Sequence, residues 1–496
     1  MDYKLLANLF ARYSKKHLHR SELDEIYLKN LLLRRFNEIS DYVGEIDYNN
    51  VDNLLVPDYL IQELYTLLGK EDLLFATEIL GLLTPSPSEV INKFFELKKS
   101  SSLEALNYLY DLQIKNNYIQ KTAIDKNIKW DYFTHNNRLE ITINLSKPEK
   151  NNKDIAKALT VKQENKYPSC LLCIENLGYG GNANHPAREN IRIIPFKLDG
   201  DDFFMQYSPY CYYDQHCIVI NKKHVPMSIH KKTFAHLLDF VDIFEEYFIG
   251  SNSDLPIVGG SILSHEHYQG GIHKLPIMYS KPRYTFYSKS KELKIEYLDW
   301  FNSCIKLSSK NKNAIFEAME VVRTKWIAYS NSEIDIINFT NETRHNTITP
   351  IVKKENGEYT AYLILRNNRT NDIHPDGIFH AHKEYHNIKS EGIGLIEAMG
   401  LFILPGRLQR QCKEIENILL NGADENYYNE HNDMLIHKDF ITRLQDTYKI
   451  TKDNVKDVIK DAINDTCMHI LENTAVFKND ELGNKSAIKF IESLDL

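Results

Sequence analysis

The sequence predicts an α+β fold, with a helical N-terminal region followed by two regions of antiparallel sheet. Apolar side chains recur at helical spacing from residue 2 to about residue 117, and at 139–145 the pattern changes to alternation with a period of two. Beyond that point, several strand-like runs precede each amphipathic helix. Because parallel α/β folds alternate strands and helices one by one, this order favours an antiparallel α+β arrangement.

The helical region is expected to occupy residues 1–135. Its apolar periodicity predicts helices at 57–68, 73–83, 88–98 and 102–117. Pro85 and Pro87 separate the second of these helices from the third. Since no chemical motif occurs in this region, we expect it to serve as a structural arm or an oligomerisation surface.

The remaining chain divides by pattern into a first half at 136–283, a second half at 284–423 and a helical tail at 424–496. In the first half we expect strands at 139–145, 191–195, 203–207 and 216–220, and helices at 154–159 and 228–248. In the second half we expect helices at 291–307, 314–318 and 395–404, and strands at 347–352 and 359–365. The repeated order of strands and then a helix suggests a diverged duplication.

The composition excludes some classes of partner. Hydrophobic residues make up 43% of the 496 residues and charged residues 26%, which is ordinary for a globular protein of two or three domains. The net charge of −8 leaves no extended basic surface, so we expect no nucleic-acid partner and only local phosphate pockets.

The sequence also predicts a cytoplasmic protein without a membrane partner. The N-terminus lacks the basic and apolar segments of a signal peptide, and no apolar run reaches about 18 residues. Seven cysteines are an odd number for a disulfide framework, and only Cys170 and Cys173 are closely spaced. This cysteine pattern fits best a reducing compartment, with Cys170 and Cys173 as one pair of the kind that binds a metal ion.

The most distinctive stretch runs from Gly259 to His273. An apolar run at 255–258 and the alternation after it predict a strand on which His265, His267 and Gln269 share one face. An isolated pair of histidines is more often structural than functional. Here two imidazoles and an amide make a poor apolar core, and the flanking glycines allow a ligand to approach the backbone. We therefore expect a functional site.

The Cys170-x-x-Cys173 spacing lets two thiolates bind one Zn²⁺, which needs two further nitrogen or sulfur ligands. Taken alone, such a pair is metal-binding, redox-active or neither in comparable proportion. No thioredoxin-like helix start follows the pair, which weakens the redox interpretation.

The motif His265-x-His267-x-Gln269 resembles the signature of galactose-1-phosphate uridylyltransferases, a branch of the histidine-triad superfamily in which Gln replaces the last His. Glu266 stands where many members have Pro, and the long chain resembles the branch found mainly in Gram-positive bacteria. The resemblance extends from about Leu139 to Arg407. It implies two histidine-triad-like antiparallel sheet halves with flanking helices, and a homodimer.

The resemblance implies transfer of a uridylyl group from UDP-glucose to galactose 1-phosphate by double displacement. His267 would be the nucleophile, because a neutral imidazole nitrogen can attack phosphorus when its other nitrogen is held as a donor. Gln269 would donate its amide N–H to a non-bridging oxygen. The missing third histidine argues against a hydrolase, where that residue protonates the leaving group.

The family's structural zinc site maps onto Cys170, Cys173, His224 and His265. His216, inside a predicted strand, is the rival for the third ligand and ranks behind His224. The family also carries a His-x-His motif associated with a second metal in some members, which matches His380-Ala-His382 here. The other ligands of that site do not map cleanly, since His374 and His386 are only neighbours of the motif, so we assign no second metal.

Several residues are candidates for holding substrate. Ser261 and Ser264, near the glycine pair, and Lys147 and Lys150, where the family carries basic residues, are expected to contact phosphate, although each is also an ordinary turn or surface residue. Glu397 is isolated in an apolar run, so its carboxylate must be paired or must bind something, and a sugar's hydroxyls would suit it. Unassigned candidates for the sugar phosphate are Arg344, Arg366, Arg369 and Arg407.

Two other functions compete with this interpretation. One is a dinucleoside polyphosphate phosphorylase or hydrolase of the same superfamily. The other is a non-catalytic binding protein stabilised by zinc, with the helical region contacting partners. Gln269 disfavours the hydrolase, and the His-x-His-x-Gln pattern disfavours mere binding.

Overall fold

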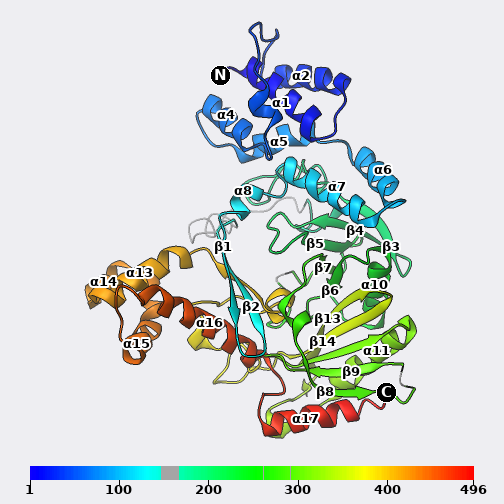
Figure 1. The fold of residues 1–496 in the computed structure, drawn as a ribbon, viewed down its shortest axis with the longest axis vertical. Coiled ribbons are helices and arrows are strands. Elements are labelled where there is room, and N and C mark those ends of the chain that lie inside the picture. The colour runs from blue at the N-terminus through cyan, green and yellow to red at the C-terminus, as the bar shows by residue number, and fades with distance from the viewer. Residues whose placement is uncertain (147–166, 261, 291) are drawn as a thin grey trace. The chain divides into compact units, whose positions relative to one another are not determined.

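The computed structural model describes residues 1–146, 167–260, 262–290 and 292–496 (Figure 1). It confirms the α+β fold class, with a helical N-terminal region ahead of a large antiparallel sheet. The helix expected at 154–159 lies outside the described residues. Within the described ranges, no helix combines the length and the apolar composition needed to cross a membrane.

The helices expected at 57–68, 73–83, 88–98 and 102–117 correspond to α4, α5, α6 and α7 of the eight helices in the N-terminal region. The eight are α1 (Tyr3–His17), α2 (Glu22–Arg35), α3 (Asn49–Asp52), α4 (Asp58–Leu68), α5 (Leu73–Leu83), α6 (Pro87–Lys98), α7 (Ser102–Lys115) and α8 (Lys121–Ile124). Local chemistry explains several boundaries. Ser86 and Glu89 form a capping box, and Pro87 occupies the first turn of α6, where a missing N–H costs nothing.

The largest sheet in the described residues has ten strands in the order β3-β4-β5-β7-β6-β13-β14-β10-β9-β8. The first five are β3 (Ile194–Leu198), β4 (Asp201–Tyr207), β5 (Cys217–Asn221), β6 (Phe248–Gly250) and β7 (His267–Gly271), with α10 (Lys231–Ile243) before β6. The other five are β8 (Pro282–Tyr287), β9 (Lys294–Leu298), β10 (Cys304–Ser309), β13 (Asn346–Glu355) and β14 (Glu358–Asn367), with α11 (Lys312–Ala328) before β13.

The two sets of five strands repeat one topology. In each set, three strands are followed by a helix and two more strands, and the fifth strand lies between the third and the fourth. The sets meet where β6 pairs antiparallel with β13, with Gly250 opposite Ile351. This shared order supports a diverged duplication and gives the two antiparallel sheet halves that the resemblance implied.

Two predicted helices are wrong. The described part of the helix expected at 291–307 contains β9 and the start of β10, which pair antiparallel, and Glu296 of β9 forms ion pairs with Lys294 and with Lys306 across the ladder. These charges repeat with the period of a strand, and the helical interpretation missed that period. The helix expected at 395–404 ends after one turn, because Gly400 adopts a φ of 97° and the chain then enters a strand.

A smaller sheet of three strands combines β1 (Ile128–Phe133), β2 (Arg138–Asn144) and β15 (Leu401–Pro405) in the order β1-β2-β15, with β15 parallel to β2. β2 confirms the strand expected at 139–145, whereas the strand expected at 191–195 begins only at Ile194. The tail is helical as predicted, with α13 (Leu408–Asn421), α14 (Glu425–Glu430), α15 (Lys438–Thr447), α16 (Val455–Thr474) and α17 (Glu481–Glu492).

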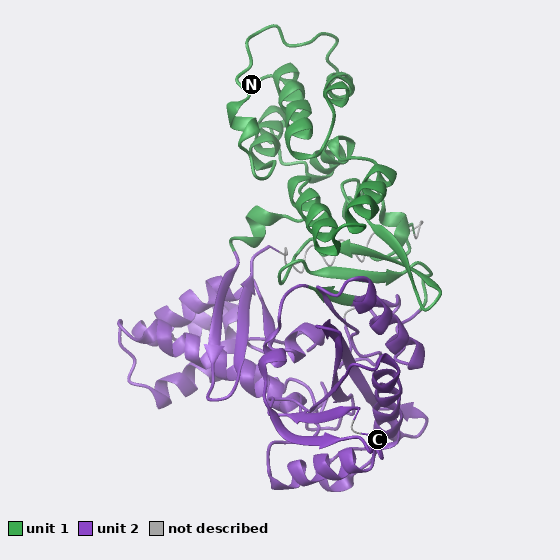
Figure 2. Cartoon of the chain, turned by 45° about the vertical axis from the view of Figure 1, so that its right-hand side comes forward, with its two compact units in different colours: residues 1–126, 150–225, 269–271 green, residues 127–149, 226–268, 272–496 purple. Residues whose placement is uncertain are grey.

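The chain forms two compact units (Figure 2). Unit 1 contains residues 1–126, 150–225 and 269–271, and unit 2 contains residues 127–149, 226–268 and 272–496. Strand β7 contributes its first two residues to unit 2 and its last three to unit 1. The division into four sequence regions stays a prediction.

Candidate active site and metal centre

The motif strand is shorter than predicted. Residues 255–258 form a turn, in which Pro256 has no N–H to donate and the Val258 N–H bonds to the Pro256 carbonyl at 2.9 Å. Ile257 has a φ of 72°, which no strand residue adopts. Strand β7 therefore starts only at His267, and His265 lies in the segment just before it.

His267 has the geometry of a neutral nucleophile. Its side chain is 6% exposed, and its Nδ1 lies 2.7 Å from the backbone oxygen of His265. A carbonyl oxygen only accepts hydrogen bonds, so Nδ1 carries the proton and Nε2 keeps its lone pair. Burial lowers the pKa of His267, which favours the uncharged ring. The predicted role requires this tautomer.

Gln269, two residues along β7, is half-buried and faces His216. Its Oε1 lies 3.0 Å from Nε2 of His216, which is 1% exposed. Burial lowers the pKa of His216 to about 4, so the ring is neutral at physiological pH. Since the amide oxygen is already bonded, the Gln269 –NH₂ group is the part available to a ligand. His216 is therefore a partner of Gln269 and not the rival metal ligand.

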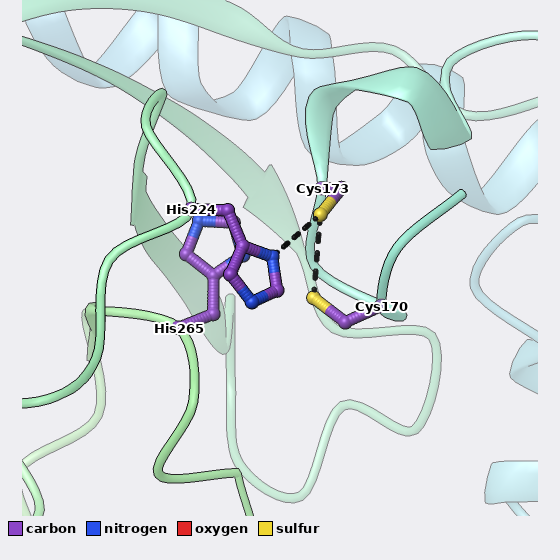
Figure 3. Close-up of side chains that lie close together, drawn as sticks. All are labelled: Cys170, Cys173, His224 and His265. Atoms are coloured by element: carbon purple, nitrogen blue, oxygen red, sulfur yellow. Dashed lines mark hydrogen bonds between the residues drawn. The ribbon is translucent and has the colours of Figure 1, made fainter. Parts of the chain in front are cut away.

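A cluster of two thiols and two imidazoles confirms that the chain can hold a metal ion (Figure 3). Its ligand atoms, from Cys170, Cys173, His224 and His265, all lie within 4.8 Å of one another. The two sulfur atoms are 3.5 Å apart, and Cys173 Sγ lies 3.1 Å from His224 Nδ1. Two thiolates and two imidazoles are a donor set that structural zinc takes, and the two separations lie close to the roughly 3.3–3.8 Å between ligand atoms on a tetrahedral zinc ion, so the chemistry of the residues present fits zinc.

An asparagine that sequence reasoning missed supports this cluster. Asn176, in the short 3₁₀ turn η1 (Ile174–Asn176), donates its side-chain N–H to the carbonyl oxygens of Cys170 at 2.9 Å and Cys173 at 2.8 Å. These two bonds fix the turn that brings the thiols together. The sequence signal was an Asn three residues after the second cysteine.

Sequence reasoning also missed a hydrogen-bond network around Glu266 and Tyr268, the residues that alternate with His265, His267 and Gln269. The Tyr268 hydroxyl donates to Glu266 Oε1 at 3.0 Å and lies 2.8 Å from Nδ1 of His236 on α10. All three residues are buried, so each polar atom needs a partner there. The network ties the start of β7 to α10, and it gives Glu266 a structural partner.

The predicted substrate residues have mixed outcomes. Lys147, Lys150 and Ser261 lie outside the described residues, and Ser264 is exposed directly before His265. Glu397 is paired inside the protein. Each of the four arginine candidates for the sugar phosphate contacts another group of the protein: Arg344 with Asp254, Arg366 with the Ile393 carbonyl, Arg369 with Asp335, and Arg407 with Gln411.

The sequence predicted that the Glu397 carboxylate, in an apolar run, must be paired or must bind something, and the structure shows it paired. It is 9% exposed, and its Oε1 lies 3.0 Å from the Lys389 ammonium, while Oε2 accepts the Gly394 N–H at 3.2 Å. Lys389 also donates to the Ile403 carbonyl at 2.8 Å. This buried ion pair explains a carboxylate in an apolar run, and contact with a hexose stays a prediction.

The second His-x-His motif makes local contacts. His380 Nε2 accepts the backbone N–H of Ile393 at 3.2 Å, and His382 Nε2 lies 3.1 Å from the Ile378 carbonyl. The His382 ring stacks on His374 with centroids 4.0 Å apart. Both imidazoles of the motif thus have a backbone partner.

Comparisons with known proteins cover nearly the whole chain. Family models described as the N-terminal and C-terminal domains of galactose-1-phosphate uridyl transferase match residues 54–226 and 240–434. The chain is 43% identical to the galactose-1-phosphate uridylyltransferase of Caldanaerobacter subterraneus, over 95% of this chain and 94% of the relative. The proteins of that name from Clostridium acetobutylicum (43% identical, 98% and 99% covered) and Fusobacterium nucleatum (38%, 100% and 99%) are similar to it as well.

Among solved structures, yeast Ap4A phosphorylase Apa2 matches with a TM-score of 0.31 and 8% identity, over 65% of this chain and 94% of that chain. This overlap is too loose to support a functional conclusion.

Proposed function

Since the chain belongs to the galactose-1-phosphate uridylyltransferase family, we propose that it is an enzyme that converts UDP-glucose and galactose 1-phosphate into glucose 1-phosphate and UDP-galactose. The observation that carries the mechanism is the hydrogen bond from His267 Nδ1 to the His265 carbonyl. It leaves Nε2 as the only ring nitrogen of His267 with a free lone pair.

In the first step, Nε2 of His267 attacks the α-phosphorus of UDP-glucose. An N–P bond forms, the bond from the α-phosphorus to the bridging oxygen breaks, and its electron pair leaves with glucose 1-phosphate. Because this leaving group is a phosphate of low pKa, it needs no third histidine to protonate it. The His265 carbonyl stabilises the ring as positive charge develops on it.

In the second step, a phosphate oxygen of galactose 1-phosphate attacks the same phosphorus. The N–P bond breaks, its electron pair returns to His267, and UDP-galactose leaves. In both steps the –NH₂ group of Gln269 donates to a non-bridging oxygen, where negative charge is concentrated. Its oxygen is held by His216, and this supports the proposed orientation.

Cys170, Cys173, His224 and His265 would hold zinc. The ion would supply a rigid cross-link at the segment that leads into β7, and it would leave the chemistry to His267. The separation of roles follows from the donor atoms, since a nitrogen that donates its lone pair to zinc cannot also attack phosphorus.

The finer assignments form part of the same proposal. Ser261, Ser264, Lys147 and Lys150 contact phosphate groups, and Glu397 contacts the hexose. The enzyme acts as a homodimer in the cytoplasm, where its cysteines, which form no disulfide in the described part of the chain, stay reduced. Light scattering at micromolar concentration tests the dimer, and a monomer would contradict it.

Incubation with UDP-glucose labelled at the α-phosphorus tests the function directly. The proposal expects label on the protein and release of one equivalent of glucose 1-phosphate before any galactose 1-phosphate is added. Addition of galactose 1-phosphate then moves the label into UDP-galactose. A phosphorylase, a hydrolase or a binding protein fails this test, because none of them holds a uridylyl group until a sugar phosphate arrives.

A further inference from the structure

The loop between β4 and β5 brings a buried histidine to the end of β7 in unit 1. His216 lies just before β5, and Tyr213 of the same loop donates its hydroxyl to the Gly270 carbonyl at 3.2 Å. A Cβ at Gly271 would lie 2.8 Å from the Tyr213 ring, so the loop approaches this strand as closely as a glycine allows. The approach places Nε2 of His216 against Gln269.

The loop holds this position in spite of unfavourable backbone angles. Cys211 has a φ of 38° and Gln215 a φ of 52°, both in the left-handed region that residues other than glycine seldom adopt. Gln215 is fixed by a hydrogen bond from its side-chain nitrogen to Asn107 Oδ1 at 2.8 Å. Such angles persist only where the surrounding contacts impose them.

The ring of His216 uses one polar contact. It stacks near Tyr212 and Tyr213, with centroids 5.6 Å and 4.4 Å away, while its Nδ1 is buried without a hydrogen-bond partner among the described residues. A phenyl ring would fill the same space and bury no polar atom. The imidazole therefore contributes one thing that an apolar ring cannot, which is the bond to Gln269.

The direction of that bond decides which end of the amide faces a ligand. If His216 Nε2 carries the proton, it donates to Gln269 Oε1 and leaves –NH₂ free. If Nε2 is bare, the amide must turn over to donate to it, and Oε1 would then repel a phosphoryl oxygen. Only the first arrangement suits phosphoryl transfer.

We propose that His216 is a positioning residue for Gln269, whose amide its Nε2–H holds with the –NH₂ group toward the phosphoryl oxygens of the substrate. This role rests on the proposed uridylyl transfer. It gives Gln269 one orientation in the free enzyme, so the donor needs no rearrangement when charge develops.

The test compares His216→Phe, which keeps the flat ring and removes the donor, with His216→Gln, which keeps an N–H donor and removes the ring. Rapid-quench measurement of His267 uridylylation by UDP-glucose should show a loss of about tenfold to a hundredfold for His216→Phe. The half-saturating UDP-glucose concentration and the metal content should stay close to wild type. His216→Gln should recover most of the rate. Equal losses in the two variants would overturn the role.

A double-mutant cycle with Gln269→Ala separates positioning from packing. The pair His216→Phe/Gln269→Ala should be no slower than Gln269→Ala alone, because His216 acts only through that amide. Losses that multiply would assign His216 to packing and overturn the proposal.

Nitrogen NMR of the labelled wild-type protein gives an answer that needs no catalysis. The signal that disappears in His216→Gln should belong to the Nε2–H tautomer, and an Nδ1–H tautomer would overturn the proposal. Absence of any uridylyl-enzyme in the wild type would refute the proposed function instead, while the tautomer would still report on the hydrogen bond.

Discussion

The two halves of the large sheet share one strand order and differ in what the fifth strand carries. In the first half, β7 is five residues long, contains His267 and Gln269, and follows a segment that supplies a candidate metal ligand. In the second half, β14 is ten residues long, pairs along its whole length with β13 and contains neither histidine nor cysteine.

The two fifth strands occupy equivalent positions in the strand order, yet only β7 carries candidate site residues. The shared topology therefore does not by itself create a site, which depends on the residues and the local backbone of each strand. A turn occupies 255–258, β7 begins only at His267, and the segment between them supplies His265 to the candidate metal cluster. In β14, continuous pairing occupies the backbone, and the side chains are buried from Ala361 to Asn367. The fifth strand of one copy thus carries the candidate nucleophile, and the fifth strand of the other is a regular, fully paired strand.

Substitution of the nucleophile should have the largest effect. His267→Gly removes the attacking nitrogen and should slow uridyl transfer on the order of a thousandfold or more, while added imidazole should restore part of it. Steady-state rates with UDP-glucose and galactose 1-phosphate measure this loss. Thr360→Ser on β14 is the matched control and should stay near wild type. Full activity of His267→Gly without imidazole would contradict the assignment of His267 as the nucleophile.

Removal of the two thiols of the candidate metal cluster should have the second-largest effect. Cys170→Ser/Cys173→Ser should lose the bound metal and lower the thermal midpoint, since a structural ion contributes its binding free energy to folding. Elemental analysis and calorimetry report the two effects. Cys412→Ser, at a similarly half-buried thiol outside the cluster, should keep both properties. Full metal occupancy in the double variant would exclude this site.

Glu397 tests whether the second half also contacts substrate. Glu397→Gln should raise KM for sugar phosphates about tenfold and lower kcat, while uridylyl-enzyme formation stays possible, because attack by His267 on phosphorus does not use this carboxylate. The substitution also leaves Lys389 without its carboxylate. Glu397→Gln/Lys389→Met therefore serves as the control. Recovery of KM in this double variant would return Glu397 to a structural role.

The smallest effect is expected at Asn176. Asn176→Ala removes two hydrogen bonds to the carbonyls of the thiol-bearing turn, each worth about 1 kcal/mol. Chemical denaturation should show a stability loss of about 1–2 kcal/mol, and competition with a chelator should show weaker metal retention. A stability unchanged within error would mean that the turn forms without this support.

Sequence reasoning succeeded where the determinants are local. The helices at 73–83 and 88–98 followed from apolar periodicity and the break at Pro85 and Pro87, and the strand at 139–145 followed from its alternation. It failed at 294–309, where cross-strand ion pairs in β9 and β10 decide the structure, and at Gly400, whose positive φ a pattern of apolar residues does not reveal. These determinants depend on the strand order, which the sequence alone does not display.

At the candidate site, too, the motifs were predicted from the sequence and the contacts between distant residues were not. The family pattern named the four residues that the structure brings together as a candidate metal cluster, although they lie up to 95 positions apart. The partners of these motifs were missed, because His216 reaches Gln269 across 53 positions and His236 reaches Tyr268 across 32. No spacing rule connects residues that a β-sheet brings together, so these contacts needed the structure.

The most direct test of the account is the position of the uridylyl group. After exposure to UDP-glucose, the protein is digested without acid, because a phosphoramidate is acid-labile, and the peptides are analysed by mass spectrometry. The hydrogen bond that leaves Nε2 of His267 free predicts an adduct on His267 and none on His265. A uridylyl group on His265, or on any residue other than His267, would contradict the account.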